Sequence, residues 1–219
     1  MSNGRKEEYV VKEFDRASKH YDESRFVKSY QLRTQILVIN RMQIKKGMHI
    51  LDLGCGTGWG TIDIASKLGG TGKVVGLDLS EKMIEQAKQK LAKFTHNNVV
   101  FEVGSGNSLD CANCFDYVLS TNAFHHFDKK ELIFSRVCKS LKPNGIFIIQ
   151  DICDDYLSMK IVDLAGKIGE RAHVGSTTSE GLRKLFYSTG FEEVEIERMR
   201  LNWFWRIMIG KGIRRSEER

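Results

Sequence analysis

The spacing of hydrophobic and polar positions changes near residue 47, and this change organises the chain. Before it, residues 6–46 carry apolar positions at helical spacing, in two runs separated by the polar stretch YDES at 21–24. After it, short apolar runs alternate with amphipathic ones as far as residue 152. The pattern therefore predicts an N-terminal helical segment followed by alternating strands and helices.

Five short apolar runs predict β-strands, and three of the intervening segments predict helices. The strands are expected at 49–53, 74–79, 99–103, 115–120 and 145–151, and the helices near 58–69, 80–93 and 128–141. The stretch KPNG at 142–145 predicts a turn before the fifth strand. Because strands and helices alternate, we expect an α/β fold with a mostly parallel sheet and helices on both faces.

The last part of the chain has a different pattern. Residues 153–189 predict two helices, GFEEVEIERMR at 190–200 alternates with a period of two, and LNWFWRIMIG follows closely. We interpret these last two runs as strands at the far edge of the sheet, antiparallel to each other. The 219 residues are then expected to form a single domain, with a helical cap at 1–46, a core at 47–152, a helical insertion over the ligand site at 153–189, and a strand pair with a tail at 190–219.

Three glycines follow the first predicted strand in the stretch LDLGCGTG at 51–58. Glycine permits positive φ and lets the backbone approach a ligand, and the crevice beyond the carboxyl end of such a strand is the expected ligand site. The spacing of Gly54, Gly56 and Gly58 fits neither the phosphate-binding loop G-x-x-x-x-G-K-[ST] nor the dinucleotide fingerprint G-x-G-x-x-G. A G-x-G-x-G loop preceded by Asp52 remains to be explained.

LDLGCGTG followed by VVGLDLS at 74–80 resembles motifs I and II of the class I S-adenosylmethionine-dependent methyltransferases. FDYVLSTNAFHHF at 115–127 and LKPNGIFIIQD at 141–151 are similar to later motifs of the same superfamily. The resemblance is close over 47–152 and implies a Rossmann-like, seven-stranded, mostly parallel sheet with an antiparallel strand at the edge. It also implies S-adenosylmethionine as the methyl donor and S-adenosylhomocysteine as the product.

The resemblance also implies how this chain holds the donor. Asp78 ends the second strand, and its carboxylate would accept hydrogen bonds from both ribose hydroxyls. Asp52 would order the glycine loop or meet the amino group of the ligand. The other implied contacts are the backbone of Gly54 and Cys55 at the methionine moiety, the loop glycines Gly56 and Gly58, Leu79 and Met83 beside the adenine, Tyr21 closing over the cofactor, and Ser120 and Thr121 at the methionine end.

One position departs from the family pattern. The family commonly has an acidic residue after the third strand that meets the adenine amino group, whereas this chain has Ser105 there, in FEVGSGNSL at 101–109. A serine hydroxyl accepts a hydrogen bond more weakly than a carboxylate does. We expect Ser105, Gly106 and Asn107 to line the adenine site, with Asn107 or a backbone carbonyl as a substitute for the missing acid.

Two adjacent histidines follow the fourth strand and are candidates for the methyl-acceptor site. Methyl transfer needs alignment of the acceptor, and it needs a base only where the acceptor loses a proton. Our hypothesis is that His126, with His125 beside it, orients or deprotonates the acceptor; the alternative is that these rings pack or face solvent. The segments 1–46 and 153–189 would build the pocket, and their apolar residues indicate a small, partly apolar acceptor. The nearest resemblance is to the ubiquinone/menaquinone-biosynthesis group.

Net charge says little about the class of acceptor, and an absent motif says more. The formal net charge of +6 and the sequence pI of about 9.0 are only weak evidence for an anionic partner. The place after the fourth strand lacks the Asn/Asp-Pro-Pro-aromatic motif of many amino methylases, so we expect no nucleic-acid partner. A nucleic-acid or protein methyltransferase and a non-catalytic S-adenosylmethionine-binding protein remain as alternatives to a small-molecule enzyme, and we expect a monomer or a homodimer.

Cysteine usage and hydropathy indicate the compartment. The five cysteines are odd in number and scattered, which favours a reducing compartment, and the lone C-x-x-C in CANC at 111–114 lacks a second pair, so we expect no metal. Neither a membrane-spanning run nor a signal-peptide core is evident, and we expect a cytoplasmic protein. The cationic tail RMRLNWFWRIMIGKGIRR at 198–215 suits either a membrane surface or a buried final strand, and we favour the strand.

Overall fold

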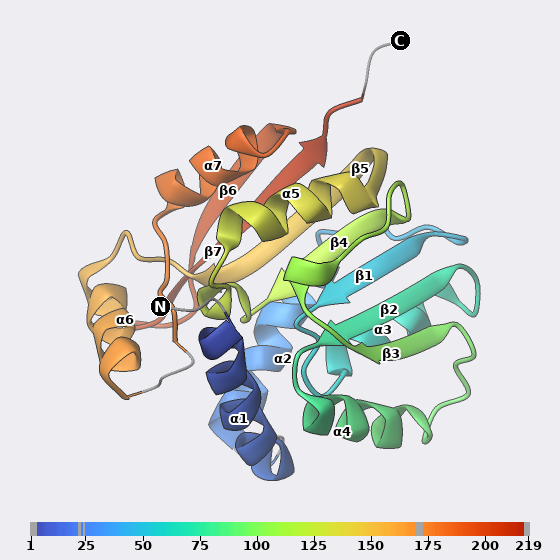
Figure 1. The fold of residues 1–219 in the computed structure, drawn as a ribbon, viewed down its shortest axis with the longest axis horizontal. Coiled ribbons are helices and arrows are strands. Elements are labelled where there is room, and N and C mark those ends of the chain that lie inside the picture. Colours follow the sequence, from blue (N-terminus) through green and yellow to red (C-terminus); the bar gives the residue numbers. More distant parts are fainter. Residues whose placement is uncertain (1–3, 22, 24, 170–172, 217–219) are drawn as a thin grey trace.

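A computed structural model describes residues 4–21, 23, 25–169 and 173–216. Its centre is one seven-stranded sheet with the order β3-β2-β1-β4-β5-β7-β6 (Figure 1). The strands are β1 (His49–Leu53), β2 (Lys73–Asp78), β3 (Val99–Val103), β4 (Phe115–Thr121), β5 (Leu141–Ile152), β6 (Phe191–Arg200) and β7 (Arg206–Arg214). Neighbours among β1 to β5 pair in parallel, and β7 runs antiparallel to both β5 and β6. The expected α/β fold with a mostly parallel sheet is confirmed.

Helices cover both faces of this sheet (Figure 1). They are α1 (Gly4–Tyr21), α2 (Arg25–Ile39), α3 (Trp59–Leu68), α4 (Glu81–Leu91), α5 (Lys130–Ser140), α6 (Leu157–Gly169) and α7 (Ser179–Ser188), with 3-10 turns η1 (Gly106–Ser108) and η2 (Phe124–His126). Apolar residues of α2 and α3 pack on one face, and those of α5 and α7 pack on the other. Helix α1 packs against α4, which brings the N-terminal segment to the carboxyl ends of the parallel strands.

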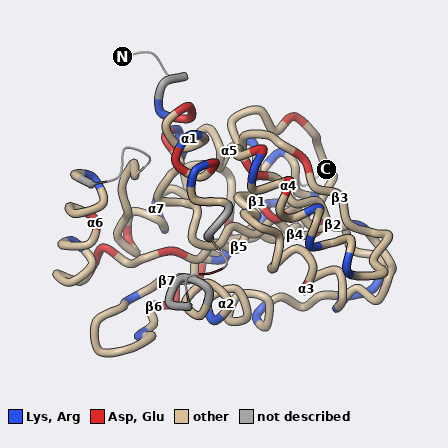
Figure 2. The backbone as a smooth tube through the Cα atoms, turned by 90° about the horizontal axis from the view of Figure 1, so that it is seen from below, with Lys and Arg blue, Asp and Glu red and all other residues tan. Residues whose placement is uncertain are grey.

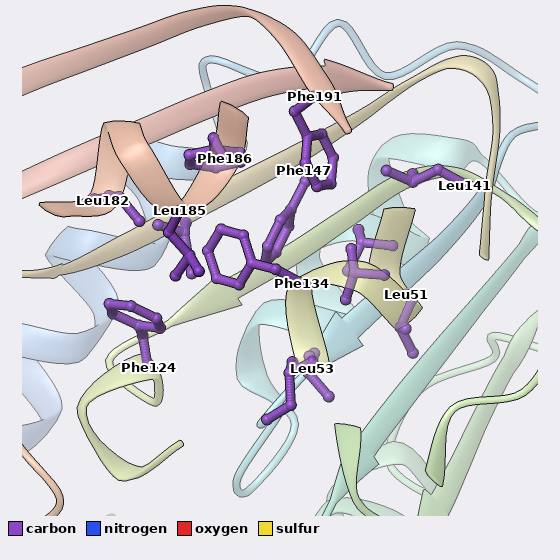
Figure 3. Packing of buried hydrophobic residues seen from close by; sticks show 14 of the residues in the cluster. Leu51, Leu53, Phe124, Phe134, Leu141, Phe147, Leu182, Leu185, Phe186 and Phe191 are labelled. Atoms are coloured by element: carbon purple, nitrogen blue, oxygen red, sulfur yellow. The ribbon is translucent and has the colours of Figure 1, made fainter. Parts of the chain in front are cut away.

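Phenylalanines form the larger core, which lies between the sheet and the helices α5 and α7 (Figure 3). The ring centroid of Phe134 lies 5.0 Å from those of Phe147 and Phe186, with the rings edge to face. Such pairs contribute about 0.5–1.5 kcal/mol beyond their buried area. Phe124 of η2 is fully buried in the same core, 5.8 Å from Phe134. The core therefore anchors the backbone of η2, which carries the two candidate histidines.

Three details of the fold differ from the sequence pattern or refine it. The stretch 142–145, expected as a turn, lies within β5, where the pairing with β4 shifts register between Phe115 and Tyr117, so the extra residues form an irregularity of the strand. The antiparallel strand β7 lies one position in from the edge, and β6 is outermost. Helix α7 buries Leu182 and Phe186 in the core, so it is part of the layer on the sheet.

Candidate functional site

The glycine loop leaves β1 in a conformation that requires glycine. The φ angles are +78° at Gly54, +52° at Gly56 and +82° at Gly58. A Cβ at Gly54 would lie 2.5 Å from the Cβ of Ala123, whereas one at Gly56 would meet no atom within 4 Å. The N–H groups of Gly54 and Cys55 donate to the carbonyl of Leu77 at 2.8 and 3.1 Å. The loop is therefore tied to β2 and presents bare backbone to open space at Gly56.

Asp78 ends β2 directly beside this loop. Its Oδ2 accepts a hydrogen bond from the N–H of Gly56 at 2.8 Å, and its Oδ1 accepts one from the N–H of Ser80 at 2.9 Å. Burial raises the pKa of this carboxyl above its ordinary value, and the Ser80 and Gly56 N–H groups oppose the rise. Because a carboxylate has about four acceptor sites, Asp78 retains capacity to accept hydrogen bonds from a diol.

Asp52 lies beneath the loop. It is buried, and its Oδ2 accepts a hydrogen bond from the hydroxyl of Thr61 in α3 at 2.7 Å. Burial raises the pKa of Asp52 from 3.8 to about 6, although the Thr61 hydroxyl opposes the rise. This position suits the ordering of the loop, because the hydrogen bond from Thr61 links the end of β1 to the first turn of α3.

Replacing Asp52 by Asn is expected to change how stability depends on pH. A carboxyl whose pKa is raised on folding keeps its proton in the folded state where the unfolded state has lost it, so its contribution to stability falls as pH rises from about 4 to about 6. The Asp52→Asn variant avoids this loss, and its free energy of unfolding should gain up to about 3 kcal/mol relative to wild type across that window. Urea unfolding at several pH values measures the difference, and a difference independent of pH would contradict the prediction.

A cavity opens beyond the carboxyl ends of β1, β2 and β4. Its wall is formed by the glycine loop, the start of α4, α1, α2 and η2. The expected site residues on its wall are Tyr21, Gly54, Cys55, Gly56, Asp78, Leu79, Met83, Ser105, Gly106, Asn107, Thr121 and His126. Residues proposed for the cofactor and for the acceptor therefore line one continuous cavity.

Four expected site residues lie behind this wall. They are Asp52, Gly58, Ser120 and His125. Gly58 precedes α3, where a Cβ would lie 2.6 Å from the ring of Phe101, so this glycine serves close packing. Ser120 is fully buried in β4. Because successive residues of a strand point to opposite faces, Thr121 reaches the wall and Ser120 does not.

His125 is engaged with a buried carboxylate. Its Nδ1 lies 2.8 Å from Oδ1 of Asp151, and its backbone N–H donates to Oδ2 of Asp151 at 2.9 Å. Burial alone would raise the pKa of Asp151, but the neighbouring His125 and the N–H groups of Ile152 and His125 hold that pKa below its ordinary value. His125 of η2 is thereby held against Asp151 near the end of β5.

His126, in contrast, lies on the cavity wall. Its ring centroid is 4.9 Å from that of Phe14 in α1, with the rings edge to face, and 4.0 Å from that of His125. A third ring, His173, lies 6.3 Å from His126 and holds Asp163 of α6 through Nε2 at 2.8 Å. The His126 ring is therefore enclosed by α1, η2 and the segment that follows α6. The sequence analysis missed His173, because only tertiary packing brings it here.

A carboxylate does lie beside Ser105, and it comes from α1. The hydroxyl of Ser105 donates to Oε1 of Glu7 at 2.5 Å, and Nδ2 of Asn107 donates to the same oxygen at 2.6 Å. Among the described residues, none donates a hydrogen bond to Oε2. Glu7 also lines the cavity. The sequence analysis missed it because an acid in an N-terminal helix has no local pattern that links it to a loop about a hundred positions later.

Other unexpected wall residues flank the motifs or come from the helical cap. They include Val10, Gln31, Leu32, Gln35, Trp59 and Asp128, whereas Asn122, expected beside Thr121 at the methionine end, and Phe14, expected in the acceptor pocket, also line the wall. Trp59 directly follows the glycine loop, and Asp128 directly follows the two histidines and Phe127. Proximity to a motif was therefore an available indication for these two residues, whereas the residues of α2 depend on how the cap folds onto the sheet.

The CANC stretch at 111–114 and the cationic tail at 198–215 lie outside the cavity. All five cysteines are free thiols, including the pair at 111 and 114. Within 4–21, 23, 25–169 and 173–216, no cluster of three or more His, Cys, Asp and Glu side chains is arranged to hold a metal ion. No helix in the described part of the chain combines the length and apolarity needed to cross a membrane. In the cationic tail, β7 buries Ile207, Met208 and Ile209 in the sheet.

Comparison with known sequences identifies a family and several relatives. The profile of a family described as a methyltransferase domain matches residues 44–190. Demethylmenaquinone methyltransferases of Geobacillus stearothermophilus and Lactococcus lactis subsp. lactis are 34% identical over 146 residues and 33% identical over 142 residues. These matches cover 65% and 64% of this chain, but only 62% and 56% of the relatives, so the chain spans less than two thirds of their length.

Solved structures share the fold at lower identity. Phosphoethanolamine N-methyltransferase 2 of Haemonchus contortus, in complex with S-adenosylmethionine, has a TM-score of 0.76 at 20% identity, over 92% of this chain and 57% of that chain. The YcgJ protein of Bacillus subtilis has a TM-score of 0.74 at 17% identity, over 84% and 99%. These similarities establish the architecture. With the family match over residues 44–190, they show that the chain belongs to the class I S-adenosylmethionine-dependent methyltransferases.

Proposed function

We propose that this chain transfers a methyl group from S-adenosylmethionine to a small, partly apolar, quinone-like acceptor. The observation that carries the proposal is that one cavity has the glycine loop, Asp78, His126 and residues of α1 in its wall. The names of the demethylmenaquinone methyltransferases among its relatives support a quinone-like acceptor. The chain then holds donor and acceptor in one enclosure.

The residues of the cavity fit an adenosyl ligand. Bare backbone at Gly56 permits close approach, and Asp78 offers a half-buried carboxylate for two ribose hydroxyls. Leu79 and Met83 supply apolar surface beside them. When bound, S-adenosylmethionine supplies a methyl group that its sulfonium already activates. The chain contributes alignment and exclusion of water, and positioning of this kind lowers a barrier by roughly 7–11 kcal/mol.

The acceptor side of the cavity is aromatic and comes largely from α1. Phe14 packs edge to face on His126, and the ring centroid of Tyr21 lies 6.2 Å from that of Phe14. The side-chain amide of Gln31 in α2 donates to the Tyr21 hydroxyl, which holds the tyrosine at the wall. This arrangement suits a flat, partly apolar ring. His126 then orients the acceptor or removes its proton.

Glu7 supplies the acid that Ser105 lacks. Ser105 and Asn107 fix its Oε1, and Oε2 remains as an acceptor for the amino group of an adenine that lies beside Leu79 and Met83. A hydrogen bond to a charged acceptor is roughly twice as strong as one between neutral groups. Because α1 carries this acid, docking of the cap and binding of the donor are coupled. With Glu7 in this place, the serine at position 105 is no argument for the non-catalytic alternative.

Replacing Glu7 by Gln is expected to weaken S-adenosylmethionine binding by about tenfold to hundredfold, since a charge-assisted hydrogen bond contributes about 1.5–3 kcal/mol. The double variant Glu7→Gln with Ser105→Asp should recover most of that affinity, because it restores a carboxylate at the end of β3. Glu8→Gln is the matched control, since Glu8 is an exposed partner of Lys12. Calorimetry measures all four proteins. Wild-type affinity in Glu7→Gln would show that Glu7 does not contact the adenine.

Two measurements in sequence test the proposed function. Calorimetry with S-adenosylmethionine comes first, and absence of binding would overturn the whole proposal. Release of S-adenosylhomocysteine is then followed with a demethylmenaquinone analogue that has a short side chain, alongside a panel of polar metabolites. We expect turnover with the quinone analogue. Turnover with polar metabolites alone would retain the methyltransferase and overturn the quinone-like acceptor.

A further inference from the structure

Helix α6 exposes an apolar stripe that no described segment covers. Its members are Leu157, Ile161, Leu164 and Ile168, with 75%, 59%, 59% and 80% of each residue exposed. At 3.6 residues per turn these four positions lie within an arc of about 60° on one side of the helix. The opposite side faces the protein, where Met159 and Asp163 are buried. An amphipathic helix with its apolar side in water indicates a surface that binds something apolar.

The connection between β6 and β7 lies next to the start of α6 and adds an exposed aromatic residue. Trp203 in that connection is 79% exposed, and the hydroxyl of Ser158 in α6 donates to the carbonyl of Phe204 at 3.2 Å. The first turn of α6 therefore lies against this connection. We call the four α6 residues and Trp203 together the α6 surface. An exposed tryptophan next to an aliphatic stripe has the composition of segments that lie in the boundary of a bilayer.

The charges around the α6 surface are mainly basic, although one of them, Arg198, is paired with Asp155 at 3.4 Å. Lys160 and Lys167 follow one edge of the stripe on α6, and Arg198, Arg200 and Arg206 lie in β6 and β7 on either side of the connection that carries Trp203. Figure 2 shows Lys or Arg positions both on α6 and near this connection. The acid of this helix, Asp163, is buried and bonded to His173, Ser176 and Lys167. An apolar strip with basic residues beside it complements a membrane surface that carries anionic lipids.

The α6 surface is also joined to the cavity. Asp163 holds His173, and the ring of His173 lies 5.3 Å from that of His125 and 6.3 Å from that of His126. The backbone N–H groups of Val174 and Gly175 donate to the carbonyl of His125 at 3.0 and 3.1 Å. The helix that bears the stripe is thus fixed to η2, which carries His126, the candidate residue of the acceptor site.

We infer that the α6 surface binds the face of a lipid bilayer that carries anionic headgroups, with the apolar stripe and Trp203 in the headgroup boundary. This contact rests on the proposed function for its biological purpose. An apolar quinone-like acceptor partitions into a bilayer, and a docked α6 keeps the cavity beside that bilayer. The contact is peripheral. It shares Trp203 and the arginines around it with the cationic tail at 198–215, but it is centred on α6, since β7 lies in the sheet.

Co-sedimentation of the purified protein with vesicles tests the inference without any methyl transfer. Vesicles of phosphatidylcholine with phosphatidylglycerol are expected to carry the wild type to the pellet, and added salt should weaken this binding. The variant Ile161→Asp with Ile168→Asp should lose at least about tenfold in binding. The matched control is Phe94→Asp with Tyr187→Asp, which adds the same charge at exposed positions near α4 and on α7 and should bind as wild type does.

Two results would overturn the inference. One is that the wild type stays in the supernatant with anionic vesicles. If the wild type is then a dimer in sedimentation velocity and the stripe variant is a monomer, the stripe binds a second copy of the chain and not a bilayer. The other is an equal loss of vesicle binding in both double variants, which would assign the effect to net charge. Calorimetry with S-adenosylmethionine on the same samples shows whether the variants are folded. Failure of the quinone-analogue assay leaves the vesicle result unaffected, so the two proposals fail separately.

Discussion

Replacing Asp78 by Asn is expected to weaken the binding of S-adenosylmethionine by about a hundredfold or more. The carboxylate already accepts N–H groups from Gly56 and Ser80, one on each oxygen. An asparagine would turn its NH₂ toward one of these donors, and it would lose the charge that strengthens bonds to both ribose hydroxyls. Two charge-assisted hydrogen bonds at about 1.5–3 kcal/mol each account for a loss of this size.

Calorimetry with S-adenosylhomocysteine and its 2′,3′-dideoxy analogue isolates the ribose contact. The wild type should lose affinity when the hydroxyls are removed, and Asp78→Asn should bind both ligands equally weakly. Glu81→Gln is the control for the general effect of an acid at the start of α4, since Glu81 is exposed in the first turn of that helix. If Asp78→Asn still distinguished the two ligands as wild type does, Asp78 would act on the helix and not on the ribose.

The fold was predictable where local pattern decides structure. The strands at 49–53 and 99–103 begin and end where their apolar runs do, and Gly54 and Asp78 mark the ends of β1 and β2. The order of β7 and β6 was not predictable in the same way, because both runs have strand periodicity and only tertiary packing selects which one pairs with β5. Likewise, α7 packs into the phenylalanine core through Phe186, a contact that helical spacing alone does not place.

The residues of the candidate site also separate into those that local sequence predicts and those that depend on tertiary packing. Residues next to strand ends, such as Gly56, Asp78 and Thr121, reach the cavity because parallel strands bring their carboxyl ends to one edge. Sequence alone did not resolve Ser120 from Thr121, which depends on the face each residue takes. Glu7 and His173 come from segments far from the motifs in sequence. Their positions follow from how the cap and the segment after α6 fold onto the sheet.

Replacing His126 by Gln is expected to reduce turnover by about 10²–10⁴-fold, the usual contribution of a positioned acid or base, if the acceptor gives up a proton to this ring. His126 lines the cavity, and Phe14 and His125 pack on its ring, so its orientation is set before the acceptor arrives. Glutamine keeps a polar group of similar reach but has no basic nitrogen. The affinity for S-adenosylmethionine should stay near that of wild type, because Asp78, Glu7 and the glycine loop hold the donor.

Turnover and donor affinity together separate the possible roles of His126. Turnover is followed by release of S-adenosylhomocysteine at saturating donor, and donor affinity is followed by calorimetry. His49→Gln is the matched control, since His49 is exposed at the start of β1, the end of the strand away from the glycine loop. A large loss of turnover with unchanged donor affinity assigns His126 to the acceptor. Unchanged turnover in His126→Gln would show that the imidazole takes no part in the reaction. The chain would then contribute to catalysis through alignment in the cavity alone, as expected for acceptors that need no base.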